Sequence, residues 1–430
     1  MAFFPGVALA LCLGSGAVRA AEPGLPSPLS LEQALALADQ AHPDLVISGA
    51  RVDAARADLE QAESLTGLRA SVELTPQRVQ PSTDPAHARI DDSRARLLVQ
   101  KRLYDFGRSR SLEDSARAQV DARELAYLDE RQRRRIEILT RFYEVLLADL
   151  RYSVDNEALA HDFVQFDRGR ERHRIGQLSD VDLLELEQRF QDARIQRTAS
   201  QARQSSTRLQ LAHALNRPND LPGELLRPAP AGARDIPDHK LLFEQAHRHN
   251  PALAVLRKDT EAARALVDAE RARRRPVLSA EFEAAAYERE LQARDDLRAT
   301  LNLRIPLYQG GEDRAAIAQA LARLHEQEAR LAKGEFELRQ SVLDLVQELE
   351  GLKVALEAAK VRSSYRDLYL DRSRALYEME VRTDLGDAMT RSTEAQWLAA
   401  QAEFRQAIAW AKLDALTGRL LETKSQEGKP

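Results

Sequence analysis

The chain has 430 residues, of which 30% are charged, and a formal net charge of −5. This slightly acidic balance gives no reason to expect a nucleic-acid partner. The only cysteine, Cys12, lies in the leader, so the mature chain has no disulfide, thiolate metal site or cysteine nucleophile. Long polar helices fit the composition better than several compact cores.

The first twenty residues have the character of a secretory signal peptide. Residues 3–13 are mostly apolar, and Val18-Arg19-Ala20 offers a small-residue cleavage site, which predicts a signal peptide at 1–20. A lipoprotein site at Cys12 is the alternative, although Leu11 precedes it where a small residue is expected. No later run approaches the ~18 apolar residues of a membrane helix. If the chain spans a membrane, it must therefore do so with strands.

The first half of the chain, residues 21–216, combines short strands with very long helices. Apolar and polar residues alternate with a period of two at about 68–76 and 94–104, which predicts two strands. A helix of roughly 65 residues follows, about 100 Å long at 1.5 Å per residue. We expect the chain to reverse near Gly176, with a helix returning from Ser179.

The second half, residues 241–420, repeats this pattern. The segment 250–253 (Asn-Pro-Ala-Leu) matches 42–45 (His-Pro-Asp-Leu), and Leu307-Tyr308 matches Leu103-Tyr104. The repeat predicts strands at about 277–287 and 296–307 and a second long helical hairpin.

Two further segments complete the predicted organisation. A Pro-rich linker at 217–240 joins the two halves, and residues 421–430 form a disordered tail.

Four amphipathic strands per chain cannot close a barrel. An open edge in lipid leaves backbone groups unpaired at a cost of several kcal/mol each. Because the smallest transmembrane barrels have about eight strands, at least two copies are needed, and three would supply about twelve. The inward face would carry charges of both signs, including Glu281, Glu283, Arg298 and Arg304. The alternative is a soluble sheet beside an ordinary helical bundle.

With these features the chain resembles the TolC-like outer-membrane efflux channel family. The resemblance rests on the repeated Pro segments, the strand ends at 103–107 and 307–311, and a helix-reversal motif that includes His173, Gly176, Ser179 and Asp182. It implies a mainly α fold with a membrane β-barrel. Long coiled-coil helical hairpins would form a periplasmic tunnel, and four strands per chain would contribute to a trimeric 12-stranded barrel.

The resemblance also implies the function and the partners. The chain would be the outer-membrane channel of a tripartite efflux or type I secretion system, located in the cell outer membrane and extending into the periplasm. Its partners would be two further copies in a homotrimer, a periplasmic adaptor (membrane fusion) protein, an inner-membrane RND or ABC-type pump, and outer-membrane lipid. The pump supplies the energy, so the channel is a passive exit duct with no catalytic residue and no cofactor. A non-conducting secreted coiled-coil envelope scaffold is the alternative.

An enzyme is improbable on motif grounds as well. The sequence contains no P-loop, HExxH or GxSxG motif. His247 and His249 have no other metal ligand near them in the sequence, so solvent-exposed histidines are favoured over a metal site.

The resemblance places the periplasmic entrance at the tips of the helical hairpins. Tip residues expected to contact the adaptor are Gly176, Ser179 and Thr383. Residues expected to close or line the aperture are Tyr377, Arg382, Asp182, Asp384 and Asp387. The alternative is that these groups are ordinary surface pairs and solvated charges.

Two positions of the second tip depart from the family pattern. Glu380 stands where glycine is usual, and Gly386 stands where the family often has an aperture aspartate.

Overall fold

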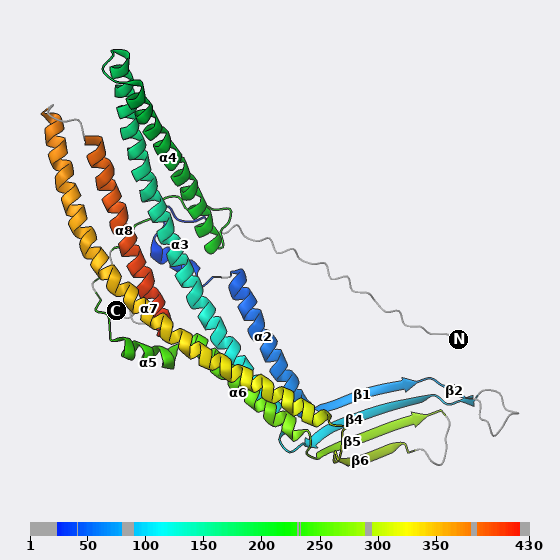
Figure 1. Ribbon diagram of the computed structural model, residues 1–430. Helices are drawn as coiled ribbons and strands as arrows, with labels where there is room; N and C mark the ends of the chain where they lie inside the picture. Colours follow the sequence, from blue (N-terminus) through cyan, green and yellow to red (C-terminus); the bar gives the residue numbers. More distant parts are fainter. Residues whose placement is uncertain are drawn as a thin grey trace, which may run out of the picture.

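The computed structural model describes residues 24–40, 42–79, 90–229, 232, 234–288, 295–379 and 385–421. The molecule is elongated, with a β-sheet at one end and the tips of two helical hairpins at the other (Figure 1). The predicted signal peptide, with Cys12, and all but the first residue of the predicted tail lie outside the described residues. Among the described helices, none combines the length and the apolar character required to cross a membrane.

Four antiparallel strands form the main sheet, in the order β1-β4-β5-β6. Their bounds are β1 Leu68–Thr75, β4 Arg94–Tyr104, β5 Val277–Tyr287 and β6 Leu297–Arg304. Two short strands, β2 (Arg78–Val79) and β3 (Ile90–Asp91), pair beyond β1 and β4. The hairpins of the two halves join through β4 and β5, so one continuous sheet contains both.

Strand β6 ends three residues before the end expected from the sequence. Arg304 pairs with Val277, the first residue of β5. The next residues on the two strands include Pro306 and Pro276, and a proline has no backbone N–H to donate to a ladder. The pairing therefore stops at Arg304.

Two helices of 67 residues, each about 100 Å long, run the length of the body. They are α3 (Arg108–Arg174) and α7 (Glu312–Glu378). Helices α2 (Pro43–Glu63) and α4 (Asp180–Ala214) pack along α3, while α6 (Pro251–Ala272) and α8 (Leu385–Leu416) each pack against both α3 and α7. The helices thus form a layer of four columns in the order α2/α4, α3, α6/α8, α7 (Figure 1).

The remaining helices are short and lie against the long ones. Helix α1 (Leu31–Leu37) packs on α3, and α5 (His239–His249) packs on α7. A single 3-10 turn, η1 (Ser64–Thr66), joins α2 to β1.

The repeated His-Pro and Asn-Pro segments are helix starts. The His42 Nδ1 accepts a hydrogen bond from the Asp44 backbone N–H at 3.2 Å and caps α2. The Asn250 Oδ1 accepts one from the Leu253 N–H at 2.8 Å and caps α6. In both helices proline follows the cap, where its missing N–H costs nothing and its fixed φ favours the helix.

The strand-to-helix turns are also equivalent in the two halves. Phe106 and Gly107 have φ of 54° and 94°, and Gly310 and Gly311 have φ of 61° and 90°. Two successive left-handed residues turn the chain sharply from strand to helix, and glycine adopts this conformation without a steric penalty. The glycines at 107, 310 and 311 therefore suit this turn, whereas Phe106 adopts the left-handed conformation without being glycine.

Two apolar clusters hold the middle of the layer together. The first cluster joins α1, α3, α4 and α8 around the fully buried Phe142 and Leu211. The second joins α5, α6, α7 and α8 around Leu349 and Leu413. Each cluster belongs mainly to one half of the duplication, and α8 contributes to both.

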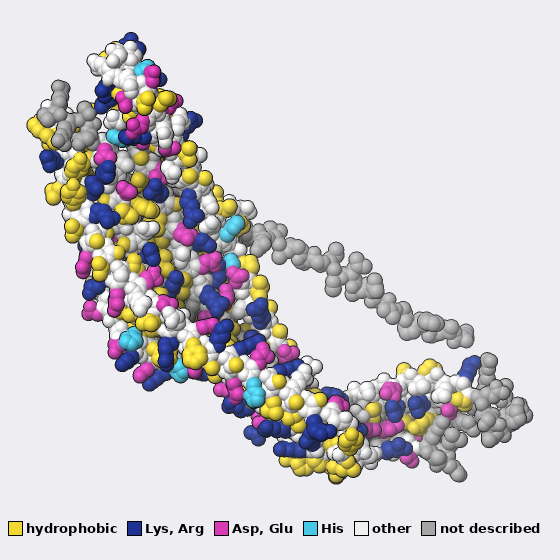
Figure 2. Space-filling model, in the orientation of Figure 1, with side chains coloured by type: hydrophobic (Ala, Val, Ile, Leu, Met, Phe, Trp, Pro, Cys, Tyr) yellow, Lys and Arg dark blue, Asp and Glu magenta, His cyan; other side chains and the backbone are white. Residues whose placement is uncertain are grey.

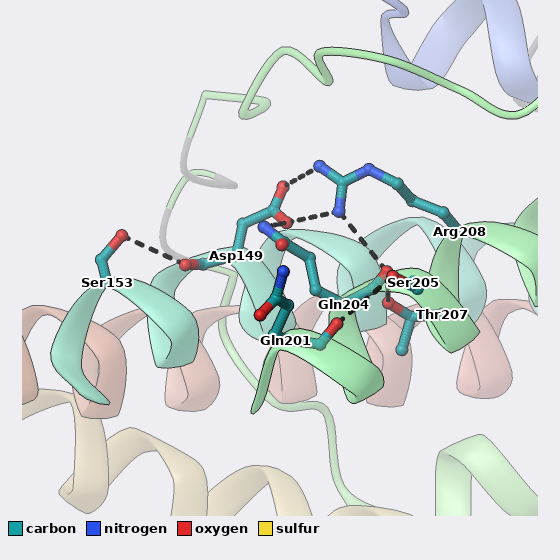
Figure 3. Close-up of polar contacts among 7 residues, drawn as sticks. All are labelled: Asp149, Ser153, Gln201, Gln204, Ser205, Thr207 and Arg208. Carbon is teal, nitrogen blue, oxygen red and sulfur yellow. Dashed lines mark hydrogen bonds and ion pairs between the residues drawn. The ribbon is translucent and has the colours of Figure 1, made fainter. Parts of the chain in front are cut away.

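A polar contact set ties α4 to α3 beside the first cluster (Figure 3). Both guanidinium Nη atoms of Arg208 donate to the Asp149 carboxylate, at 2.7 and 2.9 Å. The Gln204 side-chain amide donates to the same carboxylate at 2.8 Å. A two-point Arg–carboxylate contact fixes direction as well as distance, so it aligns the two helices.

We expect Phe142→Ala to lower the free energy of unfolding by about 3–5 kcal/mol, because it removes a fully buried ring and leaves a cavity. The measurement is denaturant unfolding in detergent, followed by circular dichroism. Phe336 is 72% exposed on α7, and Phe336→Ala is the matched control with little expected effect. Equal losses in the two variants would contradict this assignment of the core.

Candidate functional site

The strand register sorts the side chains of the sheet onto two opposite faces, because directly paired residues share a face. One face is polar. Its charged members are Arg69, Glu73, Arg94, Arg96, Arg102, Glu281, Glu283, Arg298 and Arg304. The other face is apolar. Its larger members are Leu68, Val72, Leu74, Leu97, Val99, Phe282, Leu297, Leu301 and Leu303.

The apolar face is exposed, whereas a soluble protein would pack such a face on a core. Leu74 is 72% exposed and Leu301 is 67% exposed. On the polar face only the centre is partly covered, with the side chain of Glu283 13% exposed and that of Arg96 28% exposed. Charged side chains of both signs lie over the strands in Figure 2. A contiguous exposed apolar surface of this kind marks contact with protein or lipid.

Ion pairs and hydrogen bonds link neighbouring strands across the centre of the polar face. Arg96 contacts the carboxylates of Glu73 at 2.6 Å and Glu283 at 3.8 Å. The Gln100 side-chain amide donates to Glu281 at 3.1 Å. These side-chain contacts therefore join β1 to β4 and β4 to β5, the same strand pairs that the backbone hydrogen bonds join.

All four residues predicted for the lumen lie on this polar face. Glu283 and Arg298 are directly paired between β5 and β6, and Glu281 lies two residues along β5. Arg298 also contacts Asp295 in the adjoining turn at 2.9 Å. Arg304 lies at the helix end of β6, opposite Val277.

The tip of the first hairpin brings three of the predicted residues together. Gly176 has φ of 75°, and its N–H donates to the His173 carbonyl at 2.9 Å to end α3. The Ser179 hydroxyl caps α4, accepting from the Asp182 N–H at 3.1 Å and donating to its carboxylate at 2.8 Å. His173 and Asp180 close the tip, with 2.6 Å between Nε2 and Oδ1.

The second tip is described only in part. Arg382, Thr383, Asp384 and Glu380 lie outside the described residues. Tyr377 is in the last turn of α7 and is 46% exposed. The carboxylate of Asp387, in the first turn of α8, accepts a hydrogen bond from the Arg391 Nε at 2.8 Å.

Asp182 and Tyr377 are not brought together within one chain. Asp182 is on α4 and Tyr377 is on α7, and these are the two outer helices of the layer, with α3 and α8 between them. The Asp182 carboxylate instead contacts its own cap residue, Ser179. A link between these two tips would have to join neighbouring chains.

A close contact between the two hairpins was not foreseen from the sequence. A Cβ atom at Gly386 would lie 2.6 Å from the Nδ1 of His161, so α8 approaches α3 as closely as it does only because residue 386 is glycine. Two turns further along α8, the Thr393 hydroxyl donates to Glu157 at 2.6 Å. Gly386 is thus a point where the α8 backbone packs closely against α3.

The neighbouring carboxyl group of Asp162 is affected by the same packing. Burial raises its pKa above the ordinary value, and the nearby Asp387 carboxylate acts in the same direction. His161 and Arg189 oppose this shift by lowering the pKa. No pattern in the sequence distinguishes Asp162 or His161 from the many other polar residues of α3.

Comparison with known proteins finds a family match in the second half of the chain. Residues 242–419 match the family model described as "Outer membrane efflux protein". The second half of the chain is an outer membrane efflux protein domain. This match confirms the predicted resemblance and the predicted location, the outer membrane with helices that extend into the periplasm. The family is one of outer membrane efflux proteins rather than of enzymes.

Relatives and solved structures extend the likeness beyond the efflux-protein domain. The chain is 26% identical over 269 residues to Protein CyaE of Bordetella pertussis, an alignment that covers 60% of this chain. It spans 56% of the length of that curated relative.

Two solved structures share the fold. The Campylobacter jejuni CmeC outer membrane channel has a TM-score of 0.76 and 13% identity, over 93% of this chain and 89% of that one. A Pseudomonas aeruginosa membrane protein has a TM-score of 0.73 and 20% identity, over 90% and 93%. Together with the observed hairpins and strands, these likenesses confirm the predicted fold class of one chain.

We expect Gly386→Ala to destabilise the packing of α8 on α3, by about 1–3 kcal/mol, because the added methyl group overlaps the His161 ring. Removing that ring in His161→Ala should restore most of the stability of the Gly386→Ala chain. Thermal unfolding of the two single variants and the double variant measures the coupling. Additive effects in this cycle would show that the two residues do not interact.

Proposed function

We propose that the protein is the outer-membrane channel component of a tripartite efflux or type I secretion system. It would act as a passive exit duct for substrates delivered by an inner-membrane pump. The observation that carries this proposal is the sheet with one polar face and one exposed apolar face, continued by helices of about 100 Å. In a barrel wall, the apolar face would contact lipid and the polar face would line water.

The two outer strands support assembly from several copies. Strands β1 and β6 each pair on one side only, so each has an edge of backbone groups without a strand partner among the described residues. Pairing β6 of one chain with β1 of the next satisfies both edges. Three copies would give a twelve-stranded barrel, and we therefore propose a homotrimer.

Exposed apolar residues on the two outer helices, α4 and α7, also support contact with neighbouring chains. On α4, Leu184, Ile195 and Leu209 are exposed on the side opposite the buried Ala193 and Ser200 that face α3. On α7, the exposed residues are Val354 at 66%, Val361 at 72% and Leu368 at 71%, spaced by seven. These define an α4 stripe and an α7 stripe, each a coiled-coil seam that has no partner among the described helices of its own chain.

The sheet and the helices would therefore close through the same interface. Strand β1 follows α2, in the column that ends with α4, and β6 leads directly into α7. A neighbour whose β1 pairs with β6 thus also places its α4 beside α7 (Figure 1). The same rotation that relates neighbouring copies would close both the barrel and the tunnel.

The helix tips lie at the end of the molecule farthest from the sheet, where a periplasmic adaptor would bind (Figure 1). We propose Gly176, Ser179 and Thr383 as the adaptor contact and Tyr377, Arg382, Asp182, Asp384 and Asp387 as aperture residues. Since Asp182 and Tyr377 lie on opposite outer helices, polar links between them would form between chains. Partly exposed pairs of this kind contribute only about 0–1 kcal/mol, so they could be broken on opening.

The alternative function, a secreted coiled-coil scaffold, accounts for the long helices but not for the sheet. A scaffold in water would expose Val72, Leu74, Leu297 and Leu301 to solvent. Burying such side chains is worth about 1.5–3 kcal/mol each. The exposed apolar face therefore favours the duct.

Planar lipid bilayers test the duct directly. We expect the purified mature protein to migrate as heat-modifiable trimers and to produce stepwise single-channel currents. A heat-denatured sample is the control. A monodisperse, monomeric protein in buffer without detergent, giving no current, would support the scaffold.

We expect Val361→Glu to abolish the heat-modifiable trimers, because it places a charge in the α7 stripe. Semi-native electrophoresis of outer-membrane fractions is the measurement. Leu241 is 50% exposed on α5, away from both stripes, and Leu241→Glu is the matched control. If Val361→Glu assembles as well as Leu241→Glu, the α7 stripe is not an interface.

A further inference from the structure

The charges on the polar face of the sheet are not balanced. Within the four strands of the main sheet, six arginines share the polar face with three glutamates: Arg69, Arg94, Arg96, Arg102, Arg298 and Arg304 with Glu73, Glu281 and Glu283. The opposite, apolar face has one charge in these strands, Lys101. The positive excess is therefore directed to one side of the sheet, although the whole chain is slightly acidic.

The carboxylates of this face are already occupied by neighbours. Glu73 and Glu283 both contact Arg96. Glu281 accepts a hydrogen bond from Gln100. The charge of Arg96 is therefore neutralised within the sheet. The three carboxylates already have these partners, so they do little to neutralise the other arginines.

Three of the arginines have no ion pair with any residue in the part of the chain that the structure describes. These are Arg69, Arg94 and Arg304, and all three are exposed. By contrast, Arg102 contacts Asp105 at 3.5 Å and Arg298 contacts Asp295 at 2.9 Å, both just beyond the strands. The uncompensated charge thus resides on three guanidinium groups per chain.

These three groups lie at both ends of the sheet. Arg69 and Arg304 are near the helix end, where β1 begins and β6 ends, and Arg94 begins β4 at the other end. In a closed barrel each would be repeated around the axis, so arginines would encircle the water-filled space at both ends. A low-dielectric wall focuses the field of such charges into the lumen and raises the local concentration of counter-ions.

We propose that the barrel segment of the duct takes anionic cargo, that is, molecules bearing several carboxylate or phosphate groups. This inference rests on the proposed function. Guanidinium groups remain charged at any physiological pH and bind carboxylate and phosphate oxygens with two parallel hydrogen bonds. Because the three groups have no acidic partner among the described residues, an anion would not have to displace one.

Block of single-channel current tests the proposal at the barrel itself. The long polar helices cannot cross the bilayer, so they stay on the side to which protein is added, and the barrel opens to the other side. Inositol hexakisphosphate added to the barrel side should block the current, and spermine, a polyvalent cation, should not. The same two compounds added to the helix side provide the comparison.

The variant is Arg69→Gln/Arg94→Gln/Arg304→Gln, which removes the three charges without shortening the side chains severely. We expect the concentration of inositol hexakisphosphate for half-block to rise at least about tenfold. Lys101→Gln, on the lipid side of the same sheet, is the charge-matched control for a single site and should leave the block unchanged. Arg304→Gln alone should give an intermediate shift.

The outcomes distinguish a failure of the anionic-cargo proposal from a failure of the proposed channel function. Currents that are blocked by spermine from the barrel side, or blocked equally in the triple variant and the parent protein, would overturn the anionic cargo but leave the duct intact. A preparation that forms no channels at all would overturn the proposed function and this inference with it. Block by inositol hexakisphosphate that the triple variant loses and Lys101→Gln keeps would support both.

Discussion

The two unpaired sheet edges, on β1 and β6, are the constraint on which the rest of the structure depends. Inside the sheet, the ladders β1–β4, β4–β5 and β5–β6 satisfy the backbone groups, but four strands have two outer edges. In lipid, each unsatisfied group costs several kcal/mol because no water is available to replace the missing partner. Since the apolar face is already turned outward, the chain cannot lower this cost by folding the sheet onto a core of its own. Another copy of the same sheet is the simplest source of the missing strand.

Because of the duplication, the helical columns have the same order as the strands. Each half provides a helix that leads into a strand pair and a helix that leaves it, so every strand of the sheet is continuous with one helical column. The order of the strands is consequently the order of the columns. An interface that pairs β6 with β1 cannot form without bringing α7 and α4 together, and both helices present exposed apolar residues on that side. In the proposed trimer, the backbone requirement of the barrel and the side-chain requirement of the tunnel would therefore be met by the same contact.

The sequence predicts the elements of this fold well and their lateral contacts poorly. Alternation in β1 and β6 and the paired strand ends at residues 103–107 and 307–311 are local signals, and local physics is sufficient to interpret them. The caps at His42 and Asn250 are recognisable only as a repeat in the sequence. The packing of His161 on Gly386 and the short parallel bridge between Leu29 and Leu225 join residues about 200 positions apart. A single sequence contains no periodicity that reports such pairs. The resemblance supplied the aperture residues, but it could not show that Asp182 and Tyr377 lie on opposite outer helices.

The glycine at position 386 joins the tip to the rest of the layer. Without a side chain at this position, α8 rests directly against α3, and the Thr393–Glu157 hydrogen bond holds the next turn. Movement of the second hairpin relative to the first must therefore separate a packed contact and a hydrogen bond. The outer faces of α4 and α7 carry no comparable contact within the chain. Because the contact between α8 and α3 would have to break if one hairpin moved alone, we expect the two hairpins of a chain to move together in any opening movement.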